Sequence, residues 1–268
     1  MAVTHFIQTI WSKNIYDKLE LDCKLVADCH REYEGDCKYA QSVKILGVGE
    51  PTIGDYTKQD INIEDMSDTE QILTIDQAKY FAFYVDDVDK AQSVPGLPEK
   101  FQEKAVHGLA VARDTFVANI IKTATNQTTV TDLTEDAMCK GIDEAIVELR
   151  ERNFNEEGVI ELTPKAYNLF KHKLITLSTD NPDYIKRGIV GVYDGFEVKM
   201  SNNMAKDSSH AYCDIRGKKA IAFAGQLEKV EACPAEKRFA DIVKGLDVYG
   251  GKLLDNDRIQ VIKVPLGA

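Results

Sequence analysis

Apolar residues recur at every third or fourth position over residues 4–30, which predicts an amphipathic helix with one narrow apolar stripe. The members of this stripe are Ile7, Trp11, Ile15, Leu19, Cys23 and Val26. Because the rest of the segment is largely polar, the stripe needs a partner surface. The pattern is equally compatible with a helix that lies on its own domain and with an arm that reaches a neighbouring chain.

Residues 33–66 carry two short alternating patterns, one at Val43 and Ile45 and one at Ile61 and Ile63, separated by glycine-rich turns. We interpret this segment as a long two-stranded excursion. It holds too few apolar side chains for a core of its own, and an isolated hairpin is marginal in water. We therefore expect contacts outside the hairpin to stabilise it.

Residues 71–85 predict a strand, because they are rich in aromatic side chains that favour a pleated, buried surface. Pro98 suits the first position of a helix, and the apolar period from there to about Ala124 predicts the longest helix of the chain. At about 1.5 Å per residue this helix is about 40 Å long and spans a small domain. Its predicted core face consists of Phe101, Ala105, Leu109, Ala112, Phe116 and Ile120.

The middle of the chain predicts a compact mixture of helices and strands. We interpret the polar residues 125–131 as a domain boundary, after which Asp132 and Glu135 are spaced as a capping pair. Residues 158–162 predict a short strand. The helix opened by the capping pair has a predicted core face of Met138, Ile142, Ile146 and Leu149.

The remaining third adds one more helix and then strands. Thr163 and Pro164 predict a helix start, and Asp194-Gly195 predicts the turn of a hairpin. A strand pattern begins near residue 219, and the last 30 residues alternate like a returning hairpin that ends the chain in a sheet. Strands, a long helix, a mixed insertion and further strands together predict an α+β fold.

Charge and composition narrow the function. The 268-residue chain has a net charge of −11 and no basic stripe, which argues against a protein that binds nucleic-acid phosphates tightly. No run approaches the roughly 18 apolar residues that a membrane span needs, and the N-terminus lacks the pattern of a signal peptide. We therefore expect a cytosolic protein whose cysteines are reduced thiols. These cysteines are Cys23, Cys29, Cys37, Cys139, Cys213 and Cys233.

Candidate chemistry is sparse. Cys23, Cys29, His30 and Cys37 form the only cluster that suggests a metal, but their spacing does not match zinc ligands. No phosphate-binding loop, nucleophile elbow or HExxH motif occurs. A Ser–His pair at residues 206–214 lacks an orienting third group in the sequence. We expect no catalytic, cofactor or metal site, and an enzyme that uses this loop is the alternative from another class.

Five stretches, in this order along the chain, resemble the major capsid proteins of tailed bacteriophages. The resemblance covers nearly the whole chain and is weakest at residues 125–157 and 163–185. The stretches are FIQTIWSKNIYDKL, YEGDCKYAQSVKILGVGEPTIGDY, ILTIDQAKYFAFYVDDVDKAQS, GIVGVYDGFEVKMSNNM and AIAFAGQLEKVEACPAEKRFADIVKGLDVYGGKLL.

The resemblance implies the tailed-phage capsid fold with four parts. Residues 1–31 resemble the N-terminal arm, and residues 32–69 resemble an extended loop that lies across an adjacent subunit. Residues 70–127 together with 229–268 resemble the peripheral domain, which holds the long spine helix. Residues 128–228 resemble the axial α/β domain, which meets its equivalents around the five-fold and six-fold axes.

The resemblance also implies a function, which is self-assembly as pentamers and hexamers into an icosahedral virion shell around double-stranded DNA. Expected partners are copies of the chain, a portal protein at one vertex, DNA bound without sequence-specific contacts, and no membrane. The arm starts almost at Met1, so we expect a separate scaffolding protein, or assembly without one. The resemblance also implies assembly in the cytoplasm of the bacterial host. The alternative within structural proteins is the shell of an encapsulin-type nanocompartment.

The residues expected at the interface between subunits lie in the arm and in the extended loop. We expect Val43 and Ile45 to need the surface of a neighbouring copy, and the tip around residues 47–51 to bend towards it. The full set of expected interface residues is Trp11, Ile15, Val43, Ile45, Glu50, Pro51, Thr52, Ile53 and Tyr56.

Overall fold

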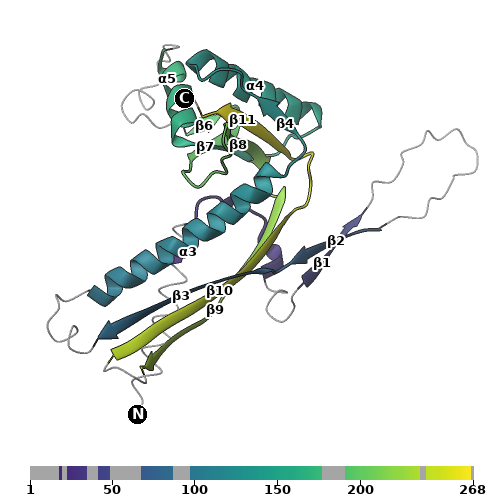
Figure 1. The fold of residues 1–268 in the computed structure, drawn as a ribbon. Helices are drawn as coiled ribbons and strands as arrows, with labels where there is room; N and C mark the ends of the chain where they lie inside the picture. Colours follow the sequence, from purple (N-terminus) through teal and green to yellow (C-terminus); the bar gives the residue numbers. More distant parts are fainter. Residues whose placement is uncertain are drawn as a thin grey trace, which may run out of the picture.

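The computed structural model shows two packed bodies and one projecting sheet (Figure 1). A three-stranded sheet with the long helix α3 forms one body, and a six-stranded sheet with helices α4 and α5 forms the other. This mixture confirms the predicted α+β class. The structure describes residues 18–19, 23–34, 42–48, 68–86, 97–176, 191–235 and 240–266.

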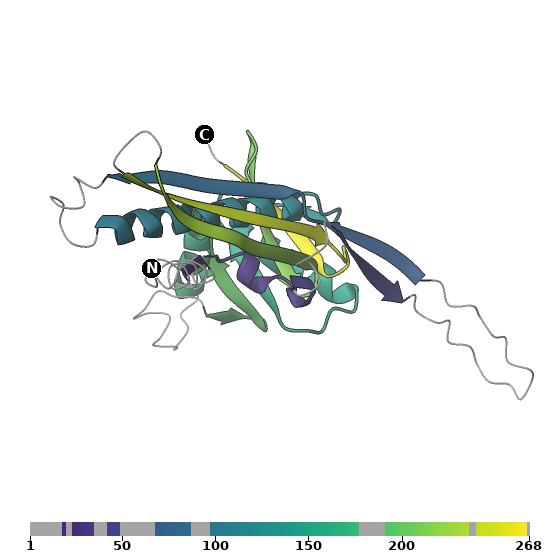
Figure 2. The same cartoon turned by 90° about the horizontal axis from the view of Figure 1, so that it is seen from below.

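The three-stranded sheet is antiparallel throughout and has the order β3-β10-β9. Helix α3 lies along one of its faces (Figures 1 and 2). Side chains alternate along the central strand, so that Val243, Asp247 and Tyr249 are buried. The strands are β3 (Gln77–Asp86), β9 (Ile221–Pro234) and β10 (Ala240–Leu253).

Helix α3 (Leu97–Lys122) has nearly the predicted bounds, and its predicted core face is partly confirmed, since Leu109 is buried and Phe116 and Ile120 pack against the core. Phe101 is 46% exposed, whereas the charged residues Arg113 and Asp114 are buried. Both charged side chains can be buried because they have polar partners. A pattern that counts only apolar residues therefore misplaces part of the buried face of the helix. The buried residues are Val106, Leu109, Ala110, Arg113, Asp114, Val117, Ala118 and Ile121.

The six-stranded sheet mixes parallel and antiparallel pairs in the order β4-β11-β8-β5-β7-β6. Helices α4 (Glu135–Glu151) and α5 (Pro164–Thr176) line the second apolar core together with the strands, and Met138, Ile142 and Phe170 are fully buried in it. The strands are β4 (Gln127–Thr129), β5 (Gly158–Leu162), β6 (Val192–Tyr193), β7 (Phe196–Met200), β8 (His210–Gly217) and β11 (Ile259–Pro265).

Local predictions in this half are mostly confirmed. Strand β5 has the predicted bounds, and the β6–β7 turn lies at Asp194 and Gly195, whose φ angles of 48° and 86° are left-handed. The predicted capping pair is wrong, because Thr134 is the N-cap of α4 and accepts the N–H of Ala137. Strand β4 of the six-stranded sheet lies within the expected boundary at 125–131, which stays a prediction.

The predicted returning hairpin at the C-terminus is wrong. Strand β10 pairs with β3 and β9, whereas β11 pairs with β4 and β8 in the other sheet. Both segments have a strand period, but periodicity does not identify the pairing partner. Strand β11 thus lies in the six-stranded sheet, although its residues fall within the segment expected for the peripheral domain.

The projecting sheet consists of β1 (Ser42–Val48) and β2 (Asp68–Thr74), which pair antiparallel. The pattern at Ile61 and Ile63 lies outside the described residues. The predicted strand 71–85 is two strands, β2 and β3, that belong to different sheets. Near the break the chain passes close to Gly250, where a Cβ atom would overlap the carbonyl oxygen of Thr74.

The N-terminal segment differs most from its prediction. Residues 18–19 are helical, but residues 23–34 form only two short 3-10 turns, η1 (Val26–Asp28) and η2 (Glu32–Glu34). The prediction of a helix as far as residue 30 is therefore wrong. Leu19, Cys23 and Val26 are buried in the core of their own chain, so this end of the stripe lies on its own domain.

Candidate assembly site and its buried anchor

The projecting sheet is attached to the body by a small apolar cluster at its base. Ile45 is 8% exposed and Leu73 is fully buried, and both belong to a cluster with Ala222 and Ala224 of β9. Val43 is partly buried against the same cluster. The chain itself covers Ile45, which corrects the expectation that this side chain needs a neighbour's surface. A contact of Val43 or Ile45 with another copy stays a prediction.

Beyond this base the sheet points away from the rest of the described chain (Figure 2). Ile72 of β2 is 45% exposed, on the opposite side of the strand from the buried Leu73. Two strands alone give little stability, so exposed apolar surface on this sheet is suited to burial against another molecule.

A second exposed apolar surface lies on the three-stranded sheet, on the face that alternates away from α3. Tyr80 is 79% exposed and Tyr84 is 60% exposed, and both project from β3 on this face. A groove of about 410 Å³ runs beside Tyr80 and is bordered by Lys244 and Leu246 of β10 and by Glu231 of β9.

Most of the predicted interface residues lie outside the described residues, so their placement stays a prediction. These are Trp11, Ile15, Glu50, Pro51, Thr52, Ile53 and Tyr56.

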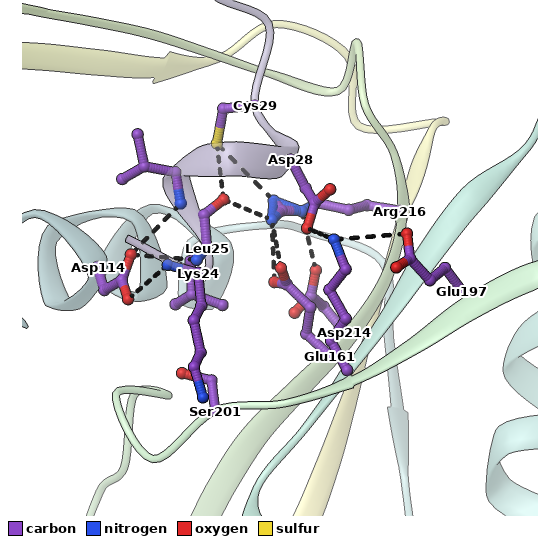
Figure 3. Close-up of polar contacts among 12 residues, drawn as sticks. Lys24, Leu25, Asp28, Cys29, Asp114, Glu161, Glu197, Ser201, Asp214 and Arg216 are labelled. Carbon is purple, nitrogen blue, oxygen red and sulfur yellow. Dashed lines mark hydrogen bonds and ion pairs between the residues drawn. The ribbon is translucent and has the colours of Figure 1, made fainter. Parts of the chain in front are cut away.

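The segment 23–30, hereafter the anchor segment, is held on α3 by one buried carboxylate (Figure 3). Asp114 accepts the backbone N–H groups of Lys24 and Leu25, each at 3.1 Å, and that of Val26 at 3.4 Å. Asn203 donates its side-chain N–H to the same carboxylate at 3.1 Å. Burial raises the pKa of Asp114, and these four donors oppose that shift by stabilising the charged form.

The other side of the anchor segment covers a row of charged residues on the six-stranded sheet. Glu161 of β5 lies directly opposite Lys199 of β7 and directly opposite Asp214 of β8. Cross-strand partners share a face of the sheet, and Arg216 lies two residues beyond Asp214 on that same face. Glu161, Asp214 and Arg216 are at most 1% exposed.

Arg216 connects this row to the anchor segment (Figure 3). Its Nη2 atom lies 2.9 Å from both carboxyl oxygens of Glu161 and 3.1 Å from the carbonyl oxygen of Leu25. Its Nε atom lies 3.3 Å from Oδ2 of Asp214. Asp28 of the anchor segment forms a second link, because it accepts a hydrogen bond from Lys199 at 2.6 Å.

Burial and charge set the protonation of this cluster. Burial raises the pKa of Glu161 well above its ordinary value and that of Asp214 to about 6, although Arg216 opposes both shifts. Burial lowers the pKa of Arg216, but its neighbouring carboxyl groups, Glu161 first, outweigh that and raise it overall. Arg216 is therefore always charged, and the two acids are the groups that can take up a proton.

A second buried ion pair holds α3 on the three-stranded sheet. Arg113 donates through Nε to Oδ2 of Asp247 at 2.8 Å and through Nη2 to Oδ1. Its guanidinium lies 5.8 Å from the ring centre of Phe223 and 5.9 Å from that of Tyr249. The pair therefore sits in an aromatic environment, where either charge alone is costly.

Hydrogen bonds to Asp207 organise the Ser–His loop, and His210 Nδ1 lies 4.0 Å from Oδ1 of the same carboxylate. Asp207 accepts the backbone N–H groups of Ser209 at 2.7 Å and His210 at 2.6 Å, and the hydroxyl of Tyr212 at 2.7 Å. The Tyr212 hydroxyl and these two backbone donors hold the pKa of Asp207 well below its usual range. The carboxylate thus stabilises the turn before β8.

The described residues offer neither a metal-binding cluster nor a membrane-spanning helix. They contain no group of three or more His, Cys, Asp or Glu side chains arranged to hold a metal ion. None of the helices in these ranges is both long enough and apolar enough to cross a membrane.

The buried charged residues beneath the anchor segment were not predicted from the sequence. The strand HAYCDIRG places Asp214 and Arg216 two residues apart among apolar residues, and GVIEL places Glu161 in an otherwise apolar strand. Alternation of this kind is normally read as a solvent-facing side. It becomes a buried site only because a segment more than 130 residues away in sequence covers it, which no local pattern predicts.

Several solved structures have a fold similar to that of this chain. A solved structure of Mycobacterium phage Che8 matches with 26% identity over 90% of this chain and 90% of that chain, at a TM-score of 0.74. The capsid structure of Cyanophage P-SCSP1u matches with 14% identity over 84% of both chains, at a TM-score of 0.69. A virus-like particle from Pyrococcus furiosus matches with 12% identity over 98% of this chain and 100% of that chain, at a TM-score of 0.62. No protein-family model and no curated protein matches the sequence.

Proposed function

Because the chain has the fold of phage capsid proteins, we propose that it assembles with copies of itself, as pentamers and hexamers, into an icosahedral shell around double-stranded DNA. The observation that carries this proposal is the match to the Che8 structure, which extends over 90% of both chains. A match of this extent includes both packed bodies, and it supports a structural shell protein over an enzyme.

The four parts are assigned accordingly. Under this proposal the three-stranded sheet with α3 belongs to the peripheral domain, and the six-stranded sheet with α4 and α5 belongs to the axial domain. The sheets shift the expected bounds, because β11 then joins the axial domain, residues 221–228 of β9 join the peripheral domain, and β2 joins β1 in the extended loop. Residues 18–19 and 23–31 are the described part of the arm.

Exposed apolar surface on the subunit supports contacts between copies. Ile72 on the projecting sheet and Tyr80 and Tyr84 on the three-stranded sheet are 45% to 79% exposed. Contacts between two different surfaces of identical chains form rings when the rotation closes, which is how pentamers and hexamers arise. The predicted interface residues of the arm and of the loop tip remain part of this proposal.

The further partners follow from the same proposal. They are a separate scaffolding protein, a portal protein at one vertex, and packaged DNA bound without sequence-specific contacts. The net charge of −11 is compatible with weak attraction for DNA. The protein is then located in the virion, after assembly in the cytoplasm of the bacterial host.

One substitution tests the interface on the projecting sheet. Ile72→Asp places a charge on exposed surface, so the subunit is expected to fold normally while the yield of closed particles in electron micrographs falls at least tenfold. Ile72→Val is the matched control, because it keeps an apolar side chain of similar shape, and it is expected to form particles as the wild type does. Normal particle yield from Ile72→Asp would exclude this surface from assembly.

A second experiment separates the virion shell from the nanocompartment. Particles purified from infected cells are expected to contain DNA that resists added nuclease until the shell is opened. Particles that enclose proteins and no protected DNA would instead support the nanocompartment, which the match to the virus-like particle keeps as the second candidate.

A further inference from the structure

The charged row and Asp28 of the anchor segment together form a cluster with more carboxyl groups than cations. Asp28, Glu161 and Asp214 supply three carboxyl groups that are at most 3% exposed. Arg216 is the one fully buried cation among the described residues of this cluster, and the partly buried Lys199 is the second cation. With all five groups ionised, the cluster carries one net negative charge in a site where only Lys199 is partly exposed.

Hydrogen bonding identifies where this excess charge is least tolerable. Neither carboxyl oxygen of Asp214 accepts a hydrogen bond from any described residue, although both oxygens are buried. The cationic group closest to Asp214 is the guanidinium of Arg216, through its Nε atom. The Nη2 atom of the same guanidinium is already shared by Glu161 and the carbonyl oxygen of Leu25. A buried carboxylate without a donor is costly, and Glu161 lies directly opposite on the neighbouring strand.

We propose that the cluster is a proton-operated latch, in which one proton shared by Glu161 and Asp214 is needed to keep the anchor segment docked. A protonated carboxyl donates one hydrogen bond, so the shared proton gives Asp214 the donor that it lacks. It also removes the excess charge. Loss of the proton leaves two opposed carboxylates beneath the segment and loosens it.

Every element packed against this pair contributes to the latch. The anchor segment supplies Asp28, the thiol of Cys29 and the carbonyl oxygen of Leu25, and β7 supplies Lys199 with the more exposed Glu197 beside it. On the far side of β8, strand β11 supplies the apolar Val261 opposite Asp214. Helix α3 holds the same segment through Asp114, which receives backbone N–H groups and is not part of the row.

The direction of the pH effect follows from the docked and undocked states. Undocking exposes Asp214 to water, where its pKa returns from about 6 towards the ordinary value of 3.8. Between these values the docked state binds more protons, so docking is strongest at low pH and weakens as pH rises. A shift of about two pKa units corresponds to about a hundredfold change in the docking equilibrium. The raised pKa of Glu161 extends the effect to higher pH.

Hydrogen exchange of the full chain measures docking directly. The amide of Leu25 is bonded to Asp114, and that of His30 is bonded to the carbonyl oxygen of Ile221 at 2.8 Å. After correction for intrinsic exchange, protection of the peptide that contains residues 23–30 is expected to fall about a hundredfold between pH 4 and pH 7. Protection that stays constant over this range would overturn the proposal.

Two variants separate the latch from general effects of pH. Glu161→Gln replaces the shared proton by a permanent neutral donor, so its protection is expected to vary at least tenfold less than that of the wild type over the same range. Any remaining variation reports Asp114, whose pKa burial also raises. Glu156→Gln removes an exposed carboxylate that pairs with Arg258, and it is expected to keep the wild-type pH profile. A Glu161→Gln profile that matches the wild type would contradict the latch.

A spectroscopic measurement on the wild type keeps the proposal testable if the buried variant fails to fold. Exposed carboxyl groups are ionised at pH 6, so an infrared carbonyl band of a protonated acid at that pH reports a buried one. We expect this band in the wild-type subunit. Its absence would show that the cluster is fully ionised and would refute the shared proton.

Discussion

Replacing Arg113 with methionine tests how the long helix α3 is held on the three-stranded sheet. Arg113 is 2% exposed and Asp247 is fully buried, and two hydrogen bonds join them. Methionine keeps much of the side-chain volume but leaves the carboxylate of Asp247 buried without its cation. Removal of one member of such a pair typically costs about 3–5 kcal/mol of unfolding free energy.

The second single variant leaves the opposite charge behind, and the double variant removes both charges. Asp247→Leu leaves the Arg113 guanidinium buried beside the rings of Phe223 and Tyr249 without its carboxylate, and we expect a loss of about 3–5 kcal/mol here as well. Arg113→Met combined with Asp247→Leu removes both charges and places two apolar side chains in apolar surroundings. We expect this double variant to lie within about 2 kcal/mol of the wild type.

Urea unfolding of the unassembled chain, followed by circular dichroism, measures these differences from the midpoints and slopes of the transitions. A cycle of four proteins isolates the coupling between the two side chains. A double variant that loses as much stability as the two single variants together would refute the reasoning. It would mean that the two residues contribute by independent packing and not as an ion pair.

Further predictions concern glycines and thiols. Gly250→Ala is expected to lower the thermal unfolding midpoint clearly, since a Cβ atom there would overlap the carbonyl oxygen of Thr74, with a cost of at least about 2 kcal/mol. Gly108→Ala, in the same assay, is expected to stabilise by about 0.5–1 kcal/mol, because α3 has open space at this position and alanine favours a helix; a loss of stability would contradict this. Burial raises the pKa of Cys213 to about 12, so mass spectrometry should find it unmodified by a thiol reagent at pH 8 while the partly exposed Cys233 reacts.

Elements governed by local rules could be predicted from the sequence. Strand β5 keeps its predicted bounds of 158–162, because breakers and a helix start enclose a short apolar run. The turn at Asp194 and Gly195 has the left-handed dihedral angles that its residue types favour. Helix α3 begins one residue before the predicted Pro98. In each case the residues themselves determine the conformation.

Features that depend on distant partners could not be predicted. The N-terminal helix does not continue to residue 30, because Asp114, far along the chain, binds the backbone N–H groups of Lys24 and Leu25. Strands β10 and β11 separate into two sheets, although their sequences alternate alike. The charged residues beneath the anchor segment could not be predicted for the same reason. The sequence pattern of Glu161 and Arg216 is typical of solvent-facing side chains, and they are buried because the N-terminal segment covers them.

Cryo-electron microscopy of particles formed by the purified chain tests the central proposal most directly. The account predicts closed icosahedral shells of pentamers and hexamers in which the sheet β1–β2 of each subunit lies on a neighbouring copy and covers Ile72. A chain that stays monomeric at high concentration under all assembly conditions, or shells in which β1–β2 contacts no neighbour, would contradict it.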